Sequence, residues 1–394
     1  MIQSMAMMFL MGLALSVLMQ KIHLPRLLGF LLSGILLGPC MLGLIDDKTM
    51  MISGDLRTMA LIIILIKAGL SLDLKDLKKV GRPALLMSFL PASFEIMAYG
   101  VFAPSILGLT RIEALLLGAV MGAVSPAVVV PYMVKIMEEN YGTKKGIPQL
   151  ILAGSSLDDV YTIVLFGTFL SMLQGKGVSA KGFLEVPVRI LLGVAGGILI
   201  GKLLVRLFES RFARGNLIRN SMKVVIILDA AFFLKEFENH APFSGLLAVI
   251  TMALVIGQDM PDIVGGRLAA KFGKLWIAAE VILFVLVGAE VNTDAMLKTG
   301  PKALLMIAVA LLIRMVGVQV ALTGTGFTKK ERLFTGIAYL PKATVQAAIG
   351  GVPLALGLPC GQTVLSLSVI AIMVTAPLGA LGMEATYEKC LTRE

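Results

Sequence analysis

Two adjacent carboxylates, Asp158 and Asp159, lie inside the apolar run Ile151–Phe166. A charge at the centre of a bilayer costs about 2.5–3.5 kcal/mol on insertion scales, so charged residues at that depth usually have a function. Ser155, Asp159 and Thr162 are spaced at i, i+4 and i+7, and they therefore share one face of a helix. This face offers hard oxygen ligands, which suit a small cation or a proton.

Paired aspartates can also activate water for hydrolysis. Neighbouring residues on a helix diverge by roughly 100°, whereas paired-carboxylate hydrolases direct two carboxylates at one water. The spacing of Asp158 and Asp159 therefore disfavours a membrane protease. Their negative charge also disfavours a symporter for an organic anion and favours a cationic substrate. A purely structural alternative, in which the pair hydrates a kinked helix at a cavity mouth, stays open.

Among the further charged residues in apolar segments, three are candidates for a defined role: Glu95, Arg314 and Lys342. Arg314 lies in the middle of Ala303–Leu322, a run otherwise without charge, and it needs an anionic partner because a guanidinium stays protonated in proteins. We predict an ion pair between Arg314 and Glu95, with Asp158 as the competing partner. Lys342 follows a proline and is predicted to neutralise the carbonyl end of a half-helix. These roles can be structural as well as functional.

Two apolar segments contain helix breakers. One is Ser125-Pro126, and the other is Leu340-Pro341-Lys342. A proline removes a backbone donor and frees polar groups, which are tolerated at membrane depth only where protein or a cavity satisfies them. Taken singly, both could be ordinary proline kinks. Interrupted helices in corresponding positions of two halves are typical of a transporter's binding site, so we predict two broken helices entering the membrane from opposite sides.

The elements that must position these residues are membrane-spanning helices. Of the 394 residues, 57% are hydrophobic and 15% are charged, whereas a soluble domain has about 45–50% apolar and about 25% charged residues. Counting runs of about 20 apolar residues predicts an all-α polytopic membrane protein with about thirteen spans. The predicted spans lie near 4–20, 24–44, 56–73, 83–107, 112–136, 147–173, 184–208, 221–237, 244–258, 274–292, 303–322, 331–355 and 363–382.

The charge distribution gives orientation and partners. The net charge is +10, but the basic residues cluster in alternate loops, as the positive-inside rule expects. This pattern argues for a lipid bilayer and against nucleic acid as the partner, and it places the N-terminus outside and the C-terminus in the cytoplasm. Cys40, Cys360 and Cys390 fit no metal or disulfide spacing, and only two histidines are present, so no cofactor is predicted. We expect a single membrane domain over residues 1–394.

Three motifs resemble one known family. The segments Ala123–Pro131 (AVSPAVVVP), Gly154–Asp159 (GSSLDD) and Leu340–Ala348 (LPKATVQAA) are similar to the NHA subgroup of the monovalent cation–proton antiporter superfamily. The resemblance implies an inverted-repeat antiporter fold whose broken helices cross near 125–126 and 340–342. It also implies a core over about 83–173 and 303–382 that moves like an elevator. Scaffold helices over about 1–73 and 184–292 would form a homodimer.

The resemblance further implies an activity and a site. The activity would be sodium (or lithium)/proton antiport in a plasma or inner membrane, a secondary transport process and no enzymatic reaction. Asp159 would be the main carrier of Na⁺ or Li⁺ and of H⁺, and Asp158 its partner. The other residues expected to contact the ion or proton are Ser155, Thr162 and Ser125.

One position departs from many members of this superfamily. Those with an Asp-Asp pair often have lysine where this chain has Arg314. A lysine can release its proton and add to the charge moved per cycle, whereas an arginine cannot. We therefore expect electroneutral exchange of one cation for one proton. Potassium/proton antiport, or a potassium efflux system, is the alternative.

Overall fold

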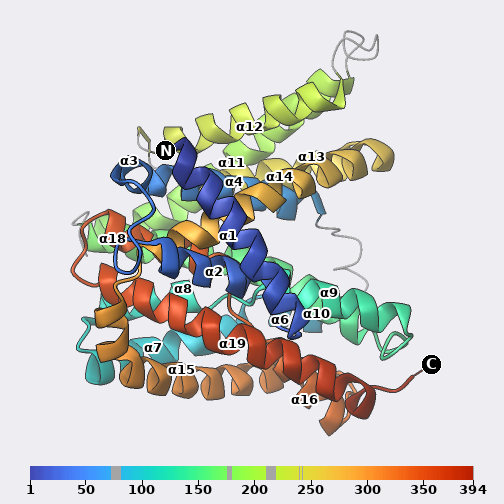
Figure 1. The fold of residues 1–394 in the computed structure, drawn as a ribbon. Coiled ribbons are helices and arrows are strands. Elements are labelled where there is room, and N and C mark those ends of the chain that lie inside the picture. Colours follow the sequence, from blue (N-terminus) through green and yellow to red (C-terminus); the bar gives the residue numbers. More distant parts are fainter. Residues whose placement is uncertain (72–80, 175–179, 210–218, 239, 242, 394) are drawn as a thin grey trace. The chain divides into compact units, whose positions relative to one another are not determined.

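A computed structural model describes residues 1–71, 81–174, 180–209, 219–238, 240–241 and 243–393 (Figure 1). Within these ranges the chain is helical apart from its loops and one isolated β-bridge between Tyr141 and Arg393. Parts of two basic loops that enter the orientation argument, 72–80 and 210–218, lie outside the described residues.

Each predicted span falls on one helix or on a run of consecutive helices. By length and apolar composition, eight helices in the described ranges can cross a membrane, and three shorter apolar stretches accompany them. The predicted all-α polytopic fold is therefore confirmed. The helices are α1 Ile2–Lys21, α2 Arg26–Leu37, α3 Asp47–Met51, α4 Ser53–Ser71, α6 Arg82–Met87, α7 Leu90–Leu107, α8 Arg111–Met121, α9 Pro126–Glu138, α10 Ile147–Leu173, α11 Ala180–Glu209, α12 Asn220–Phe237, α13 Gly245–Asp259, α14 Asp262–Ala289, α15 Thr293–Ala321, α16 Lys329–Ala338, α17 Thr344–Ile349, α18 Val352–Ala355 and α19 Gly361–Cys390.

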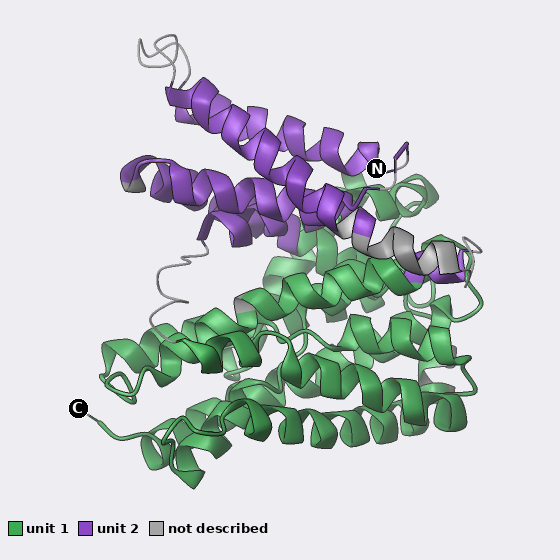
Figure 2. Cartoon of the chain, turned by 180° about the vertical axis from the view of Figure 1, so that it is seen from behind, with its two compact units in different colours: residues 1–57, 76–169, 281–394 green, residues 58–75, 170–280 purple. Residues whose placement is uncertain are grey.

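The chain divides into two compact units (Figure 2). The first comprises residues 1–57, 76–169 and 281–394, and the second comprises 58–75 and 170–280. Within the first unit α7 packs against α8 and α15, while α19 packs against α9, α15 and α16. Within the second unit α11 and α12 both pack against α13. All of the residues predicted for the site lie in the first unit.

Two spans of the first unit are broken in the same way. The first half-helices, α8 and α16, each begin with a capping box in which a threonine and a glutamate satisfy one another's backbone donors, Thr110 with Glu113 and Thr328 with Glu331. Each half-helix then ends, and a second helix starts a few residues later. The repeated start and the repeated break support two structural repeats.

The two breaks meet. The first break separates α8 from α9 at residues 122–125, and the second separates α16 from α17 at residues 339–343. The backbone N–H of Ser125 donates to the carbonyl oxygen of Pro341 at 2.8 Å. Each break leaves backbone groups without a partner inside its own helix. The hydrogen bond between the breaks satisfies one such donor and one such acceptor, which lipid could not do.

A close helix contact in the first unit gives a testable prediction. A Cβ atom added at Gly288 of α14 would collide with the carbonyl oxygen of Leu31 of α2. We expect Gly288→Ala to destabilise the protein by about 1–3 kcal/mol, since an overpacked contact forces the backbones apart. Gly300→Ala in α15 is the matched control, because a Cβ there meets no atom within 4 Å. Equal thermal unfolding midpoints for the two purified variants would contradict this prediction.

Candidate ion site at the helix crossing

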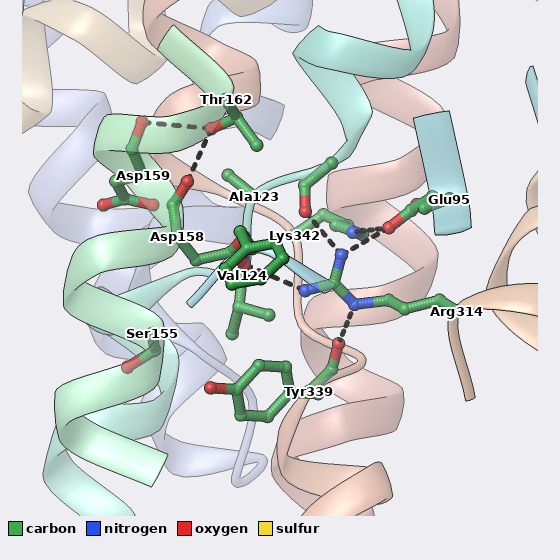
Figure 3. A network of polar contacts seen from close by, with 12 residues as sticks. Glu95, Ala123, Val124, Ser155, Asp158, Asp159, Thr162, Arg314, Tyr339 and Lys342 are labelled. Carbon is green, nitrogen blue, oxygen red and sulfur yellow. Dashed lines mark hydrogen bonds and ion pairs between the residues drawn. The ribbon is translucent and has the colours of Figure 1, made fainter. Parts of the chain in front are cut away.

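The site is assembled around the acidic pair of α10. Asp158 is fully buried, and its Oδ2 accepts hydrogen bonds from the Val124 backbone N–H at 3.0 Å and from Arg314 Nη2 at 2.9 Å (Figure 3). Val124 belongs to the first break, where the chain has left α8 and its amide has no helical partner. One oxygen of Asp158 is therefore held both by the break and by a guanidinium.

Arg314 joins four acceptors from different elements. The guanidinium, fully buried on α15, donates to Glu95 of α7 at 2.6 Å and to Asp158. It also donates to the carbonyl oxygen of Gly122 at the first break and to that of Tyr339 at the second, the latter at 3.0 Å. A planar group with five N–H donors suits this task. The sequence offered Glu95 and Asp158 as competing partners, and the structure pairs Arg314 with both.

Lys342 is paired with a carboxylate of the network. Its Nζ lies 2.6 Å from Glu95 Oε2, the same oxygen that Arg314 contacts, and both side chains are buried. Its backbone N–H donates to Thr375 Oγ1 at 2.9 Å. The role expected for Lys342, neutralising the carbonyl end of a half-helix, stays a prediction, and the carbonyl oxygens of Gly122 and Tyr339 accept hydrogen bonds from Arg314.

Asp159 has a different environment from its neighbour. Its Oδ1 is buried and has no hydrogen-bond partner in the described part of the chain. In Figure 3 its carboxylate points away from Arg314, as the divergence of neighbouring helix positions requires. Each acid thus has a buried Oδ1 without a partner among the described residues, and the two differ in that Asp158 Oδ2 is fixed by two donors.

The three predicted hydroxyl residues lie close to this pair without binding its carboxylates. Thr162 Oγ1 donates to the backbone oxygens of Asp158 and Asp159, each at 3.0 Å. Ser155 Oγ donates to the Leu152 carbonyl oxygen at 3.2 Å. Ser125 Oγ is buried with no partner among the described residues. Each hydroxyl oxygen retains acceptor capacity for an ion or a water.

The network contains one more carboxylate than it contains cationic side chains. Glu95, Asp158 and Asp159 supply three carboxylates, and Arg314 and Lys342 supply two cations. The cations contact Glu95 and Asp158, which leaves Asp159 as the surplus negative charge. Because an uncompensated charge in low dielectric is costly, this position is suited to take up one monovalent cation or one proton.

Two uncharged residues of the site carried no signal in the sequence analysis. Gln346 of α17 is fully buried, and its Nε2 donates to the carbonyl oxygens of Val120 and Ala123 at 3.1 Å each. The Tyr339 ring lies under the Arg314 guanidinium, with 5.6 Å between the guanidinium carbon and the ring centroid. Neither residue adds a charge to an apolar run, so hydropathy alone could not single them out.

The crossed broken helices and the buried acidic pair define a class: a multi-pass membrane transporter for a small cation. Comparisons with known proteins agree. A model of the transmembrane sodium/hydrogen exchanger family matches residues 5–388. Sodium/hydrogen exchanger 9B2 of Mus musculus is 34% identical over 370 residues, covering 91% of this chain and 67% of the relative. The 9B2 exchanger of Xenopus tropicalis is 35% identical over 382 residues, covering 93% and 69%.

The chain therefore belongs to the sodium/hydrogen exchanger family, whose members are secondary transporters and not enzymes. A solved structure has the same fold: the sodium proton antiporter MjNhaP1 from Methanocaldococcus jannaschii at pH 8 superposes with a TM-score of 0.81 at 20% identity, covering 97% of this chain and 95% of that one. The superfamily that the three motifs indicated, the monovalent cation–proton antiporters, is confirmed.

Proposed function

We propose that this protein exchanges Na⁺ or Li⁺ for H⁺ at Asp159, with Asp158 as its fixed partner. The inequality of the two acids is the observation that carries this proposal. Asp158 Oδ2 is held by Val124 and by the charged Arg314, whereas the cations of the network do not pair with Asp159, although Oδ1 of both acids is buried without a partner in the described chain. A proton or a sodium ion on Asp159 neutralises the site, and the two ligands compete because they use the same charge.

Alternating access follows from this competition. The loaded site is neutral with either ligand and can cross a low-dielectric barrier, whereas the bare carboxylate carries a charge that is costly to move. We propose that a core of about residues 83–173 and 303–382 moves like an elevator against scaffold helices, and that the protein works as a homodimer. The N-terminus would lie outside a plasma or inner membrane and the C-terminus in the cytoplasm.

Electroneutral exchange is supported by the charge balance. Both cations of the network contact carboxylates, and Arg314 cannot release a proton at physiological pH. We propose that Lys342 keeps its proton in its ion pair with Glu95 and that Asp159 alone changes its ligand, so that one Na⁺ replaces one H⁺. A membrane potential generated by sodium-driven turnover in proteoliposomes would contradict this stoichiometry.

The proposal is tested by proton flux. Purified protein is reconstituted in vesicles containing a pH-sensitive dye, and NaCl, LiCl or KCl is added to the outside. We expect proton movement with Na⁺ and Li⁺ and none above empty vesicles with K⁺. Flux with K⁺ alone would replace the proposal with the potassium/proton antiporter or potassium efflux alternative, and the absence of flux with all three salts would refute cation/proton exchange.

Competition between the two ligands predicts a pH dependence. At low pH, protons occupy the shared carboxylate and more Na⁺ is needed to displace them. We expect the half-saturating Na⁺ concentration to rise about tenfold for each pH unit below the pH at which Asp159 is half-protonated in the absence of Na⁺, while the maximal rate changes little. The measurement is a set of Na⁺ titrations of proton flux at several values of pH. A pH-independent half-saturating concentration would contradict competition at one site.

A further inference from the structure

We propose that Gln346 is a positioning residue for Asp158 and that it acts through the peptide group between Ala123 and Val124. The inference rests on the proposed function, because it assigns Gln346 a part in cation affinity. It connects the second broken helix with the acid that α10 holds beside the first. No charge on Gln346 is involved.

The first step is the contact of Gln346 with the end of α8. Its Nε2 donates to the carbonyl oxygens of Val120 and Ala123, both at 3.1 Å, and the side chain is fully buried. These carbonyls lie where α8 stops and the chain no longer supplies helical donors. Gln346 therefore replaces hydrogen bonds that the break removes, using both hydrogens of one amide group.

The second step lies within a single peptide unit. The Ala123 carbonyl that accepts from Gln346 belongs to the same peptide group as the Val124 N–H that donates to Asp158 Oδ2 at 3.0 Å. A trans peptide group is planar, and its C=O and N–H point in opposite directions. Fixing the carbonyl on Gln346 thus fixes the direction of the N–H toward Asp158. Hydrogen bonds in series also polarise one another, which strengthens the donor.

The third step concerns Arg314, the second residue that donates to Asp158. Arg314 donates to Asp158 and also to the carbonyl oxygen of Gly122, one residue before this peptide group. Arg314 and Gln346 therefore bind two consecutive carbonyl oxygens of the first break, those of Gly122 and Ala123. Without Gln346 the peptide group between Ala123 and Val124 loses the hydrogen bond to its carbonyl oxygen, and its N–H is directed toward Asp158 less firmly. A less well oriented Asp158 weakens the cation site that it shares with Asp159.

The experiment compares Gln346→Met with Gln319→Met. Methionine keeps the approximate volume and removes the amide in both variants, but Gln319 of α15 donates to the Arg332 carbonyl at 3.4 Å, away from the helix breaks. We expect Gln346→Met to raise the half-saturating Na⁺ concentration for proton flux by about 3- to 10-fold, the range for one lost neutral hydrogen bond, with a maximal rate within about twofold. Gln319→Met should match the unmodified protein. If Gln346→Met matches it too while Na⁺-driven flux persists, the inference fails and the proposed function stands; if the unmodified protein shows no Na⁺-driven flux, the proposed function itself fails.

A double-mutant cycle separates positioning from a general structural role. Na⁺ binding is read without turnover, as the Na⁺ concentration that gives half of the maximal rise in thermal unfolding midpoint. In an Asp158→Asn background we expect Gln346→Met to change this concentration by less than about twofold, because the residue through which it acts has been altered. The same loss in both backgrounds would show that Gln346 only braces the crossing, and would overturn the inference.

A smaller variant covers the case in which Gln346→Met does not fold. Gln346→Asn keeps the amide but is one carbon shorter and does not reach the Ala123 carbonyl, so it should raise the half-saturating Na⁺ concentration in the same direction. Failure of both variants to fold, with Gln319→Met folded, would place the role of Gln346 in assembly of the crossing and refute its part in positioning Asp158.

Discussion

Replacing Asp159 with asparagine should reduce Na⁺-driven proton flux to the level of empty vesicles. Asparagine is almost the same size but cannot carry a proton to and fro, and its neutral amide does not compensate a cation. Loss of a charged ligand alone would weaken ion binding by roughly 10- to 100-fold, and loss of proton carriage removes the coupling altogether. The measurement is dye-monitored proton flux in proteoliposomes on adding NaCl.

The same substitution should leave the fold intact. Asp159 Oδ1 has no partner to lose in the described chain, and removing a surplus buried charge relieves a desolvation cost. We expect a thermal unfolding midpoint no lower than that of the unmodified protein. Asp229→Asn on α12 is the matched control, since it is the same chemical change in a predicted span of the second unit, and it should keep full flux. Flux retained by Asp159→Asn would move the carrier away from this residue.

Among the substitutions proposed here, Arg314→Ala should lower the free energy of unfolding the most. The change leaves Glu95 facing Lys342 alone and removes the charged partner of Asp158, while two carbonyl oxygens at the breaks lose a donor. Breaking a buried ion pair from one side costs about 3–5 kcal/mol, because an uncompensated charge remains. We expect a large fall in the thermal unfolding midpoint in detergent and in the amount of protein recovered from the membrane.

Lys135→Ala provides the comparison for that loss. Lys135 Nζ lies 2.6 Å from Glu384, a distance like that in the buried network, but the two side chains are 40% and 46% exposed. An exposed ion pair contributes about 0–1 kcal/mol, so this variant should unfold within a degree or two of the unmodified protein. Similar losses in both variants would mean that burial does not determine the importance of Arg314.

The sequence predicted the parts of the fold and site that depend on charge and proline. Apolar runs of bilayer length located the helices, and Pro126 and Pro341 marked the two breaks, because lipid tolerates neither free backbone groups nor charges without partners. The same reasoning paired Glu95 with Arg314, which the structure confirms. In each case one residue in an apolar run carries an energetic cost large enough to be read from the sequence.

What the sequence left open depends on geometry between distant segments. It chose Glu95 as the partner of Arg314 and kept Asp158 as a competitor, whereas a guanidinium with five donors contacts both. It did not reveal that the Lys342 ammonium contacts Glu95. It did not single out Gln346, since a neutral amide gains its importance from the carbonyls it faces. Those carbonyls lie more than two hundred residues earlier in the chain, and no local pattern reveals them.

The ion pairs of the site also constrain how the chain is made. Glu95 and Arg314 are separated by 219 residues, and Asp158 and Arg314 by 156. At a synthesis rate of about 5–20 residues per second, Asp158 leaves the ribosome roughly 8–30 s before its guanidinium partner exists. During that interval the carboxylates of Glu95 and Asp158 must stay hydrated or hold a proton, because the membrane offers them no cation. The carboxylates of the site therefore destabilise the nascent chain in the membrane until the second repeat has been synthesised. A chain that terminates before Arg314 should be removed by the cell's quality control.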